Sequence, residues 1–212
     1  MTRRSALIVG AVCLGVAVVL GVLVIVRPGI IQGLDDAWNI EMGEWRSPAL
    51  IGFALVMNSI GGGWIATLVI PLGLAVLLLL VRGWRSAAFA LVAFLGSALV
   101  VQAIKHALGR PRPQDLLIAS DFGSFPSGHT SNAATIAIVL SLLFPHALTL
   151  IGGALWVIAM AFSRTVLSVH WFSDTVGGAL AGAGAALLVA AVVWPWIVRG
   201  RNGRGLLARV SR

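Results

Sequence analysis

LIVGAVCLGVAVVLGVLVIV, residues 7–26, is a run of twenty residues without a charged side chain. About 20 consecutive apolar residues are enough for a helix to cross the hydrocarbon core of a bilayer. Similar runs return along the 212-residue chain, which is 59% hydrophobic and 10% charged. A water-soluble domain carries roughly 25% charged residues. The sequence therefore predicts an integral membrane protein.

We expect six transmembrane helices, at residues 7–26, 63–82, 86–107, 128–144, 147–167 and 172–198. Residues 27–62 lie between the first two, with a polar first half and a short apolar second half that glycine interrupts. This stretch is expected to lie along the membrane surface or to dip into it. No internal repeat or low-complexity linker divides the chain. The predicted fold class is therefore all-α: a six-transmembrane-helix bundle, with an amphipathic or re-entrant segment, forming a single domain over residues 1–212.

The charged side chains fall on two sides of this predicted bundle. One side holds nine arginines and no acid: Arg3, Arg4, Arg82, Arg85, Arg199, Arg201, Arg204, Arg209 and Arg212. The other holds all seven acids: Asp35, Asp36, Glu41, Glu44, Asp115, Asp121 and Asp174. Cytoplasmic loops carry an excess of arginine and lysine, so both termini are expected in the cytoplasm, with the protein in the plasma membrane. The net charge of +8 then reflects topology and predicts no nucleic-acid partner.

Three polar clusters interrupt the apolar pattern, and the expected helix directions place all of them at the extracytoplasmic face. They are KHALGRPRP (105–113), FPSGHTSN (125–132) and SRTVLSVHWFSD (163–174). Each has an ordinary explanation by itself, because basic residues at helix ends reach the headgroups and Pro-Ser-Gly suits a helix start. Single histidines such as His106 and His146 are expected to be structural. Cations, two histidines and a carboxylate that converge on one face favour a functional site.

The residue types in these clusters favour phosphate chemistry. Guanidinium groups match phosphate oxygens bidentately, whereas an ammonium group is a compact point charge. Backbone amides at the start of a helix also bind anions. The candidate phosphate-binding residues are Lys105, Arg112, Ser127, Gly128 and Arg164.

Two histidines and one carboxylate complete the candidate site. His170 and Asp174 are four residues apart and share a helix face. A carboxylate on one ring nitrogen fixes the tautomer and leaves the other nitrogen free to attack. His129 can then protonate a departing oxygen. Two histidines and one acid on different helices make a poor magnesium site, so no metal and no cofactor are expected.

The three clusters together resemble the signature of a known family. Lys105, Arg112 and Pro113 fit Lys-x6-Arg-Pro, residues 126–129 read Pro-Ser-Gly-His, and residues 163–174 contain Ser-Arg-x5-His-x3-Asp. These motifs are similar to those of the type 2 phosphatidic acid phosphatases, in a superfamily with vanadium haloperoxidases and bacterial acid phosphatases. The resemblance implies metal-independent hydrolysis of a lipid phosphate through a phosphohistidine on His170. It also implies that His129 is the leaving-group acid and that Asp174 orients His170, whereas Arg110 lies outside the motif and its role stays open.

The resemblance does not choose the lipid. An extracytoplasmic site with short loops favours an undecaprenyl-type pyrophosphate. Phosphatidylglycerol phosphate, phosphatidic acid and diacylglycerol pyrophosphate are alternatives. Two further hypotheses are a phosphotransferase that passes the phosphate to another acceptor, and a non-catalytic lipid-binding or transport protein. The partners expected are the substrate lipid and the bilayer, and the oligomeric state cannot be read from the sequence.

The predicted topology is testable by thiol labelling. Ser120→Cys, in a Cys13→Ser background that removes the only cysteine, should react in intact cells with a membrane-impermeant thiol reagent. Labelling that appears only after the membrane is broken would reverse the orientation.

Overall fold

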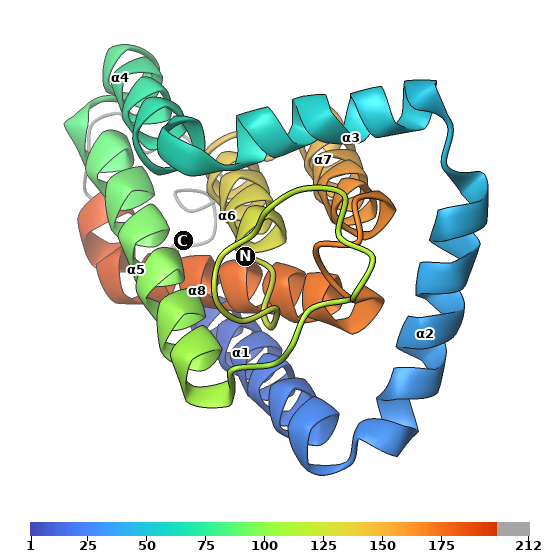
Figure 1. Cartoon of the computed structure of the whole chain (residues 1–212). Coiled ribbons are helices and arrows are strands. Elements are labelled where there is room, and N and C mark those ends of the chain that lie inside the picture. Colours follow the sequence, from blue (N-terminus) through green and yellow to red (C-terminus); the bar gives the residue numbers. More distant parts are fainter. Residues whose placement is uncertain (199–212) are drawn as a thin grey trace.

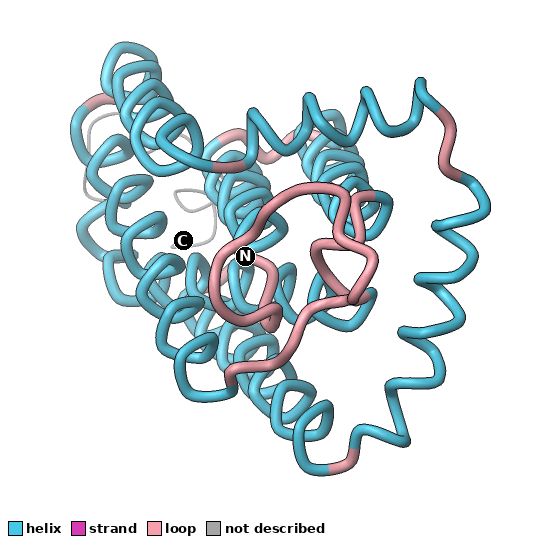
Figure 2. The backbone as a smooth tube through the Cα atoms, in the orientation of Figure 1, coloured by secondary structure: helices cyan, strands magenta, loops and turns pink. Residues whose placement is uncertain are grey.

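The computed structural model describes residues 1–198, and these form helices and loops without a strand (Figures 1 and 2). The elements are α1 (Arg3–Val26), α2 (Pro28–Trp45), α3 (Pro48–Gly61), a π-helical turn η1 (Ile65–Val69), α4 (Ile70–Arg82), α5 (Trp84–Leu108), α6 (Gly128–Leu143), α7 (Ala147–Val166) and α8 (Phe172–Val198). The predicted all-α membrane class is confirmed. The arginines at positions 199, 201, 204, 209 and 212, used above for orientation, lie outside the described residues.

Within residues 1–198, five helical segments are long and apolar enough to cross a bilayer. They are α1, η1 with α4, α5, α7 and α8, and they correspond to the expected first, second, third, fifth and sixth spans. The expected fourth span is α6, which has only 16 residues. At about 1.5 Å per residue it reaches roughly 24 Å, less than the ~30 Å of a typical hydrocarbon core. The count of six spans therefore stays a prediction.

The segment between the first two spans forms two separate helices, α2 and α3. Each begins with a proline, Pro28 or Pro48, in its first turn, where the missing N–H costs nothing. Ser47 caps α3 by accepting a hydrogen bond from the Leu50 amide at 3.3 Å. In Figure 1 the two helices follow adjoining edges of the molecule and frame the helices at its centre.

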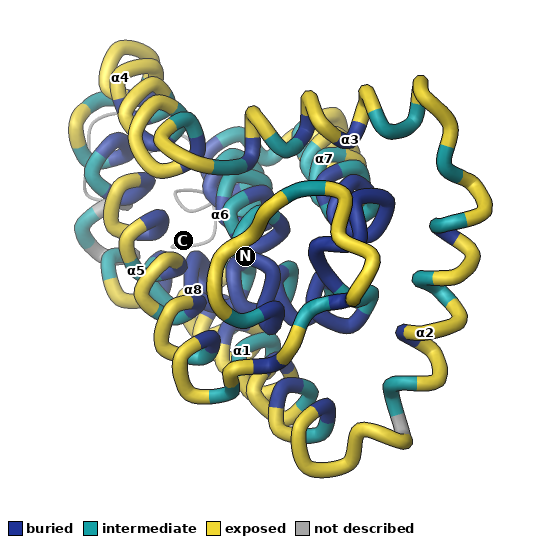
Figure 3. Tube along the Cα trace, viewed as in Figure 1, coloured by how far each residue is buried: buried dark blue, intermediate teal, exposed yellow. Residues whose placement is uncertain are grey.

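The core is built around α8, which packs against α1, α5 and α6. Buried residues gather on α6 and α8, whereas α1 and α4 expose many apolar side chains (Figure 3). Two glycines four residues apart on α8 bring its backbone against α6. A Cβ on Gly178 would lie 2.4 Å from the Ser127 carbonyl oxygen, and one on Gly182 would lie 2.1 Å from that of Ser131. Small residues at this spacing are typical of tightly packed membrane helices.

A long loop, residues 109–127, crosses one end of the bundle (Figure 2). Its anchor is Phe125, which is fully buried. The ring fits against two glycines, since a Cβ on Gly177 or Gly21 would lie 2.4 or 2.6 Å from it. Ser124 adds an amide hydrogen bond of 2.8 Å to the Arg110 carbonyl. The loop is therefore fixed to the bundle at the residues that lead into α6.

The close α6–α8 contact predicts a large effect of one methyl group. Gly182→Ala places a carbon against a backbone oxygen, and overpacking of this kind typically costs about 1–3 kcal/mol. We expect thermal melting of the detergent-purified variant to fall by several degrees. Gly73→Ala is the matched control, because no atom lies within 4 Å of a Cβ there, and its melting temperature should stay the same or rise. Equal melting of the two variants would contradict the packing described here.

Candidate active site

A pocket of about 330 Å³ lies under the 109–127 loop, where the ends of α5 and α7 meet the start of α6. Five of the predicted site residues line it: Lys105, Gly128, His129, Arg164 and His170. Arg112 lies beside them, with its guanidinium 3.4 Å from His170 Nε2. Segments far apart in the sequence thus bring the three polar clusters to one place.

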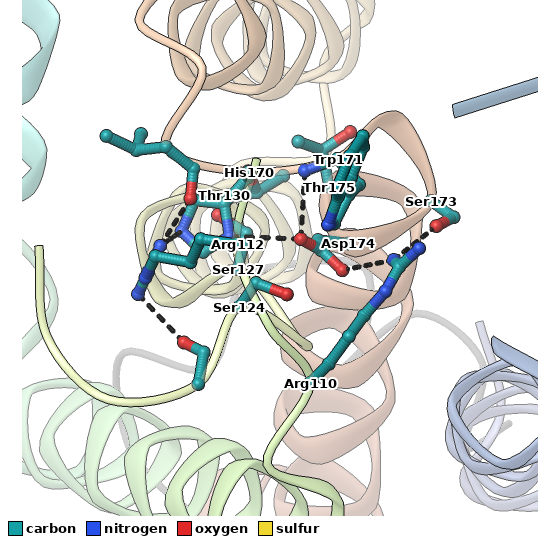
Figure 4. Close-up of polar contacts among 12 residues, drawn as sticks. Arg110, Arg112, Ser124, Ser127, Thr130, His170, Trp171, Ser173, Asp174 and Thr175 are labelled. Atoms are coloured by element: carbon teal, nitrogen blue, oxygen red, sulfur yellow. Dashed lines mark hydrogen bonds and ion pairs between the residues drawn. The ribbon is translucent and has the colours of Figure 1, made fainter. Parts of the chain in front are cut away.

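His170 lies in the turn between α7 and α8 and is 4% exposed. Its Nδ1 lies 3.5 Å from Asp174 Oδ2, which is a long contact, and has no other partner in the described part of the chain. The opposite nitrogen, Nε2, faces the Arg112 guanidinium (Figure 4). Burial lowers the pKa of His170 to about 4, with Arg112 and Lys105 acting in the same direction and Asp174 opposing them. The imidazole is therefore neutral from weakly acidic pH upward, as a nucleophile must be.

The three cations at the pocket come from different segments: Lys105 from α5, Arg112 from the 109–127 loop and Arg164 from α7. Arg164, on α7, is 1% exposed and donates to Asn58 Oδ1 of α3 at 2.7 Å. Arg112 donates to the Val169 carbonyl, and to that of Gly123 at 2.8 Å. These contacts fix the guanidinium groups before any anion arrives, and such preorganisation is what electrostatic catalysis requires.

Asp121 of the covering loop lies on two of these cations. Its carboxylate is 3.4 Å from Lys105 Nζ and 2.5 Å from Arg112 Nη2, while 65% of its side chain is exposed. Partial burial raises its pKa, but Lys105 and Arg112 outweigh this and hold the pKa of Asp121 below its usual value. A phosphate that binds Lys105 and Arg112 must therefore compete with this carboxylate. The sequence pattern places Asp121 only among the acids of the outer side, and this contact becomes visible only in the structure.

His129 lies in the first turn of α6, against a glycine-rich turn. Its Nε2 lies 3.4 Å from the Asn58 carbonyl oxygen, and a Cβ on Gly62 would lie 2.7 Å from the same nitrogen. The absence of a side chain at Gly62 is what admits the ring. The sequence motifs assign no role to Asn58, although Asn58 and Ser59 form a polar pair in an apolar stretch, and polar residues inside a membrane segment are a functional signal.

Ser127 lies deeper than the sequence suggests. Its amide donates to the Asp174 carbonyl oxygen at 3.0 Å, and its hydroxyl accepts a hydrogen bond from Thr130 at 3.2 Å. The amide expected to bind an anion is therefore already engaged in joining α6 to α8. Gly128, the next residue, does line the pocket.

Arg110, whose role the sequence left open, forms two buried ion pairs. Its Nη1 lies 2.6 Å from Asp174 Oδ1, and its Nη2 lies 2.7 Å from Asp35 Oδ2 of α2 (Figure 4 shows the first of these). Asp35 is fully buried although its neighbour Asp36 is exposed. Consecutive helical residues point in different directions, so the Asp35–Asp36 pair was the one available hint that one of them faces inward.

An apolar groove of about 430 Å³ adjoins the pocket. The two share Gly63, Val101, Gln102, Gly128 and His129. Its outer edge is formed by exposed leucines of η1, α4 and α5: Leu68, Leu72 and Leu95. The groove therefore connects the polar pocket with the apolar outer surface of the bundle.

The fold and the site together define a class of protein. It is a helical membrane protein of several spans, with a pocket lined by histidine and arginine at its helix ends. The model described as "PAP2 superfamily" matches residues 86–197, more than half of the chain. The chain belongs to the PAP2 superfamily, which confirms the family resemblance of its motifs.

Two curated relatives are each named lipid A 1-phosphatase. The one from Rhizobium johnstonii is 32% identical over 108 residues, covering 45% of this chain and 43% of the relative. The one from Rhizobium etli is 30% identical over 111 residues, covering 45% of each. The match thus spans less than half the length of these relatives.

Two solved structures are similar in fold. The first is described as the first transmembrane PAP2-type phosphatidylglycerolphosphate phosphatase from Bacillus subtilis. Its TM-score is 0.76 at 22% identity, and the match covers 86% of this chain and 94% of that chain. The second is LpxE from Aquifex aeolicus, with a TM-score of 0.64 at 24% identity over 73% of this chain and 92% of that one. At these identities the likeness shows the fold.

The position of Asp121 predicts tighter anion binding when its carboxylate is removed. An exposed ion pair is worth about 0.2–1 kcal/mol, so Asp121→Ala should lower the Kd for orthovanadate up to about fivefold. Calorimetric titration of the detergent-solubilised protein measures this Kd. Glu44→Ala removes the same charge from an exposed position on α2 and should leave it unchanged. Unchanged or weaker vanadate binding by Asp121→Ala would show that the carboxylate does not compete for the cations.

Proposed function

We propose that this protein is a lipid phosphatase that hydrolyses a membrane lipid phosphate or pyrophosphate through a phosphohistidine on His170, without a metal ion. The observation that carries the proposal is the pocket itself. A neutral, buried imidazole faces a guanidinium at 3.4 Å, and two further cations line the same cavity. Family membership and the curated relatives support the same activity.

The proposed reaction has two displacements. In the first, His170 Nε2 forms a bond to phosphorus, the bond from phosphorus to the lipid oxygen breaks, and His129 supplies a proton to that oxygen. In the second, His129 takes a proton from water, the water oxygen bonds to phosphorus, and the phosphorus–nitrogen bond breaks to release orthophosphate. Lys105, Arg112 and Arg164 stabilise the negative charge of the phosphoryl oxygens throughout. Asp174 keeps the ring proton of His170 on Nδ1, so the lone pair of Nε2 is free to attack phosphorus.

We propose an undecaprenyl-type pyrophosphate as the first candidate substrate. The apolar groove beside the pocket supports a lipid with one long chain. Its volume of about 430 Å³ is roughly three times the ~150 Å³ of a cavity that holds one benzene, so it has room for part of a single hydrocarbon chain. Phosphatidylglycerol phosphate, phosphatidic acid and lipid A 1-phosphate are the competing substrates, the first and last suggested also by the names of similar proteins.

We also propose that the site faces away from the cytoplasm. Arg82 and Arg85 flank the turn between α4 and α5, at the opposite end of α5 from Lys105. Basic residues favour the cytoplasmic side, which supports an extracytoplasmic pocket and cytoplasmic termini in the plasma membrane.

A phosphate-release assay over these four lipids, in detergent micelles with and without EDTA, tests the proposal. Release should survive EDTA and be fastest with the polyprenyl pyrophosphate. A labelled phospho-acceptor instead of free phosphate would indicate a phosphotransferase, and lipid binding without any turnover would indicate a non-catalytic binder. Loss of activity with EDTA, restored by magnesium, would contradict the metal-free chemistry.

The two histidines should respond differently to the leaving group. His170→Ala should abolish turnover of every substrate, because no phosphoenzyme can form. His129→Ala should lose about a hundred- to ten-thousand-fold in kcat on a lipid alkoxide, but much less on p-nitrophenyl phosphate, whose phenolate leaves unaided. Acid-labile, base-stable phosphate on the protein reports the phosphohistidine.

His106→Ala is the matched control, because His106 stacks on Phe122 outside the pocket. It should keep nearly full activity on both substrates. If His170→Ala retains activity on the activated ester while His129→Ala is inactive on both, the two roles are reversed.

A further inference from the structure

We propose that Asp35 and Arg110 are positioning residues that fix the orientation and charge of Asp174, and through it the reactivity of His170. This inference rests on the proposed function, because it assigns the two residues a part in attack by His170. It adds α2, a helix outside the residues matched by the family model, to the machinery of the site.

The contacts around Asp174 leave one oxygen for the histidine. Oδ1 accepts from Arg110 at 2.6 Å. Oδ2 accepts from the Trp171 amide at 2.9 Å and is the atom that lies 3.5 Å from His170 Nδ1. Because Arg110 holds Oδ1, the carboxylate cannot turn, and Oδ2 stays directed at the ring.

Asp35 holds Arg110 in turn. Its Oδ2 accepts from Arg110 Nη2 at 2.7 Å and from the Ser173 hydroxyl at 2.6 Å, and its Oδ1 accepts from the Ser173 amide at 2.8 Å. Trp171 covers the guanidinium, with its ring centre 5.5 Å from Arg110 Cζ. The three charged side chains are at most 3% exposed, so water screens them little.

The charges of this cluster do not cancel. Two carboxylates and one guanidinium leave one net negative charge behind His170. Arg110 alone would neutralise Asp174, and Asp35 prevents this. When Nε2 bonds to phosphorus, the ring becomes positive, and a net negative cluster behind it stabilises that charge. The charged groups on the Nε2 side of the ring are Arg112, Lys105 and their partner Asp121. His129, another titratable group, lines the same pocket.

A simpler role for the cluster is to attach α2 to α8. The chain contains a second polar attachment of α2 that serves as a control for this role. Arg46, directly after α2, pairs with Asp115 at 2.9 Å. Asp115 also accepts from Asn39 and Ser168, each at 2.9 Å. This second cluster ties α2 to the 109–127 loop and to Ser168 in the turn between α7 and α8. Within residues 1–198 it forms no hydrogen bond or ion pair with Asp174 or the His170 ring.

The test compares Asp35→Asn and Arg110→Gln with Asp115→Asn and the exposed Asp36→Asn. The first two variants should lose about 10- to 100-fold in kcat. This is the loss typical when a residue that hydrogen-bonds to a metal-ligating histidine is replaced, and we expect the same scale for a residue that orients a histidine. KM should stay within about twofold of wild type. Asp115→Asn is expected to lower the melting temperature without this loss. Asp36→Asn should change neither quantity.

The dependence of kcat/KM on pH distinguishes a positioning role from mere attachment of α2. The informative part is the acid limb, where kcat/KM falls as His170 becomes protonated. Asp35→Asn removes a negative charge near His170, which favours the neutral ring, so the limb should move to lower pH. Arg110→Gln removes a positive charge, which favours the protonated ring, so the limb should move to higher pH. Arg110→Lys keeps the charge and should return the limb toward its wild-type position. The midpoint of the limb does not depend on the fraction of folded protein, so a poorly folding variant still gives a result.

Trapping of the wild-type phosphohistidine is measured first. If wild type forms none, the proposed function fails. If wild type forms it, but Asp35→Asn and Arg110→Gln shift the limb in the same direction or not at all, the pair only attaches α2. A limb for Arg110→Lys that coincides with that of Arg110→Gln would equally overturn the positioning role.

Discussion

The contact between the backbones of α6 and α8 determines the geometry of the site. Gly178 and Gly182 allow the two helices to touch at carbonyl oxygens, with no side chain between them. At this distance the Ser127 amide reaches the Asp174 carbonyl oxygen, so the first turns of both helices are locked in register. His129 lies two residues after Ser127, and His170 lies four residues before Asp174. The packing of α6 against α8 therefore positions His129, in the first turn of α6, and His170, in the turn that leads into α8.

Much of the fold and part of the site can be predicted from the sequence, because a bilayer permits few backbone conformations. A backbone in hydrocarbon must satisfy its own hydrogen bonds, which forces the apolar runs into helices. Charges are costly there, so polar clusters mark either helix ends or function. This reasoning located Lys105, Arg164 and His170 on one face. Helix α6 lies at Gly128–Leu143, close to the expected 128–144, but its 16 residues make it shorter than a typical membrane span.

What the sequence could not reveal depends on contacts between distant segments. Asp35 precedes Arg110 by 75 positions, and the Asp35–Asp36 pair hints that one acid faces inward without indicating its partner. Asp121 lies in a loop whose path is set by the burial of Phe125, a tertiary event. The engaged Ser127 amide likewise depends on how close α8 comes. In each case local pattern gives the residue type, but the partner is fixed only when the helices pack.

The groove between η1, α4 and α5 has a consequence for how a substrate would be encountered. Because it opens on the apolar outer surface and shares residues with the polar pocket, a lipid can bind with its tail still among its neighbours in the membrane. The work of extracting a long hydrocarbon chain into water is avoided. Encounter then takes place in two dimensions, so turnover would follow the mole fraction of the lipid within the bilayer, and diluting it with inert lipid would slow the reaction even at constant bulk concentration.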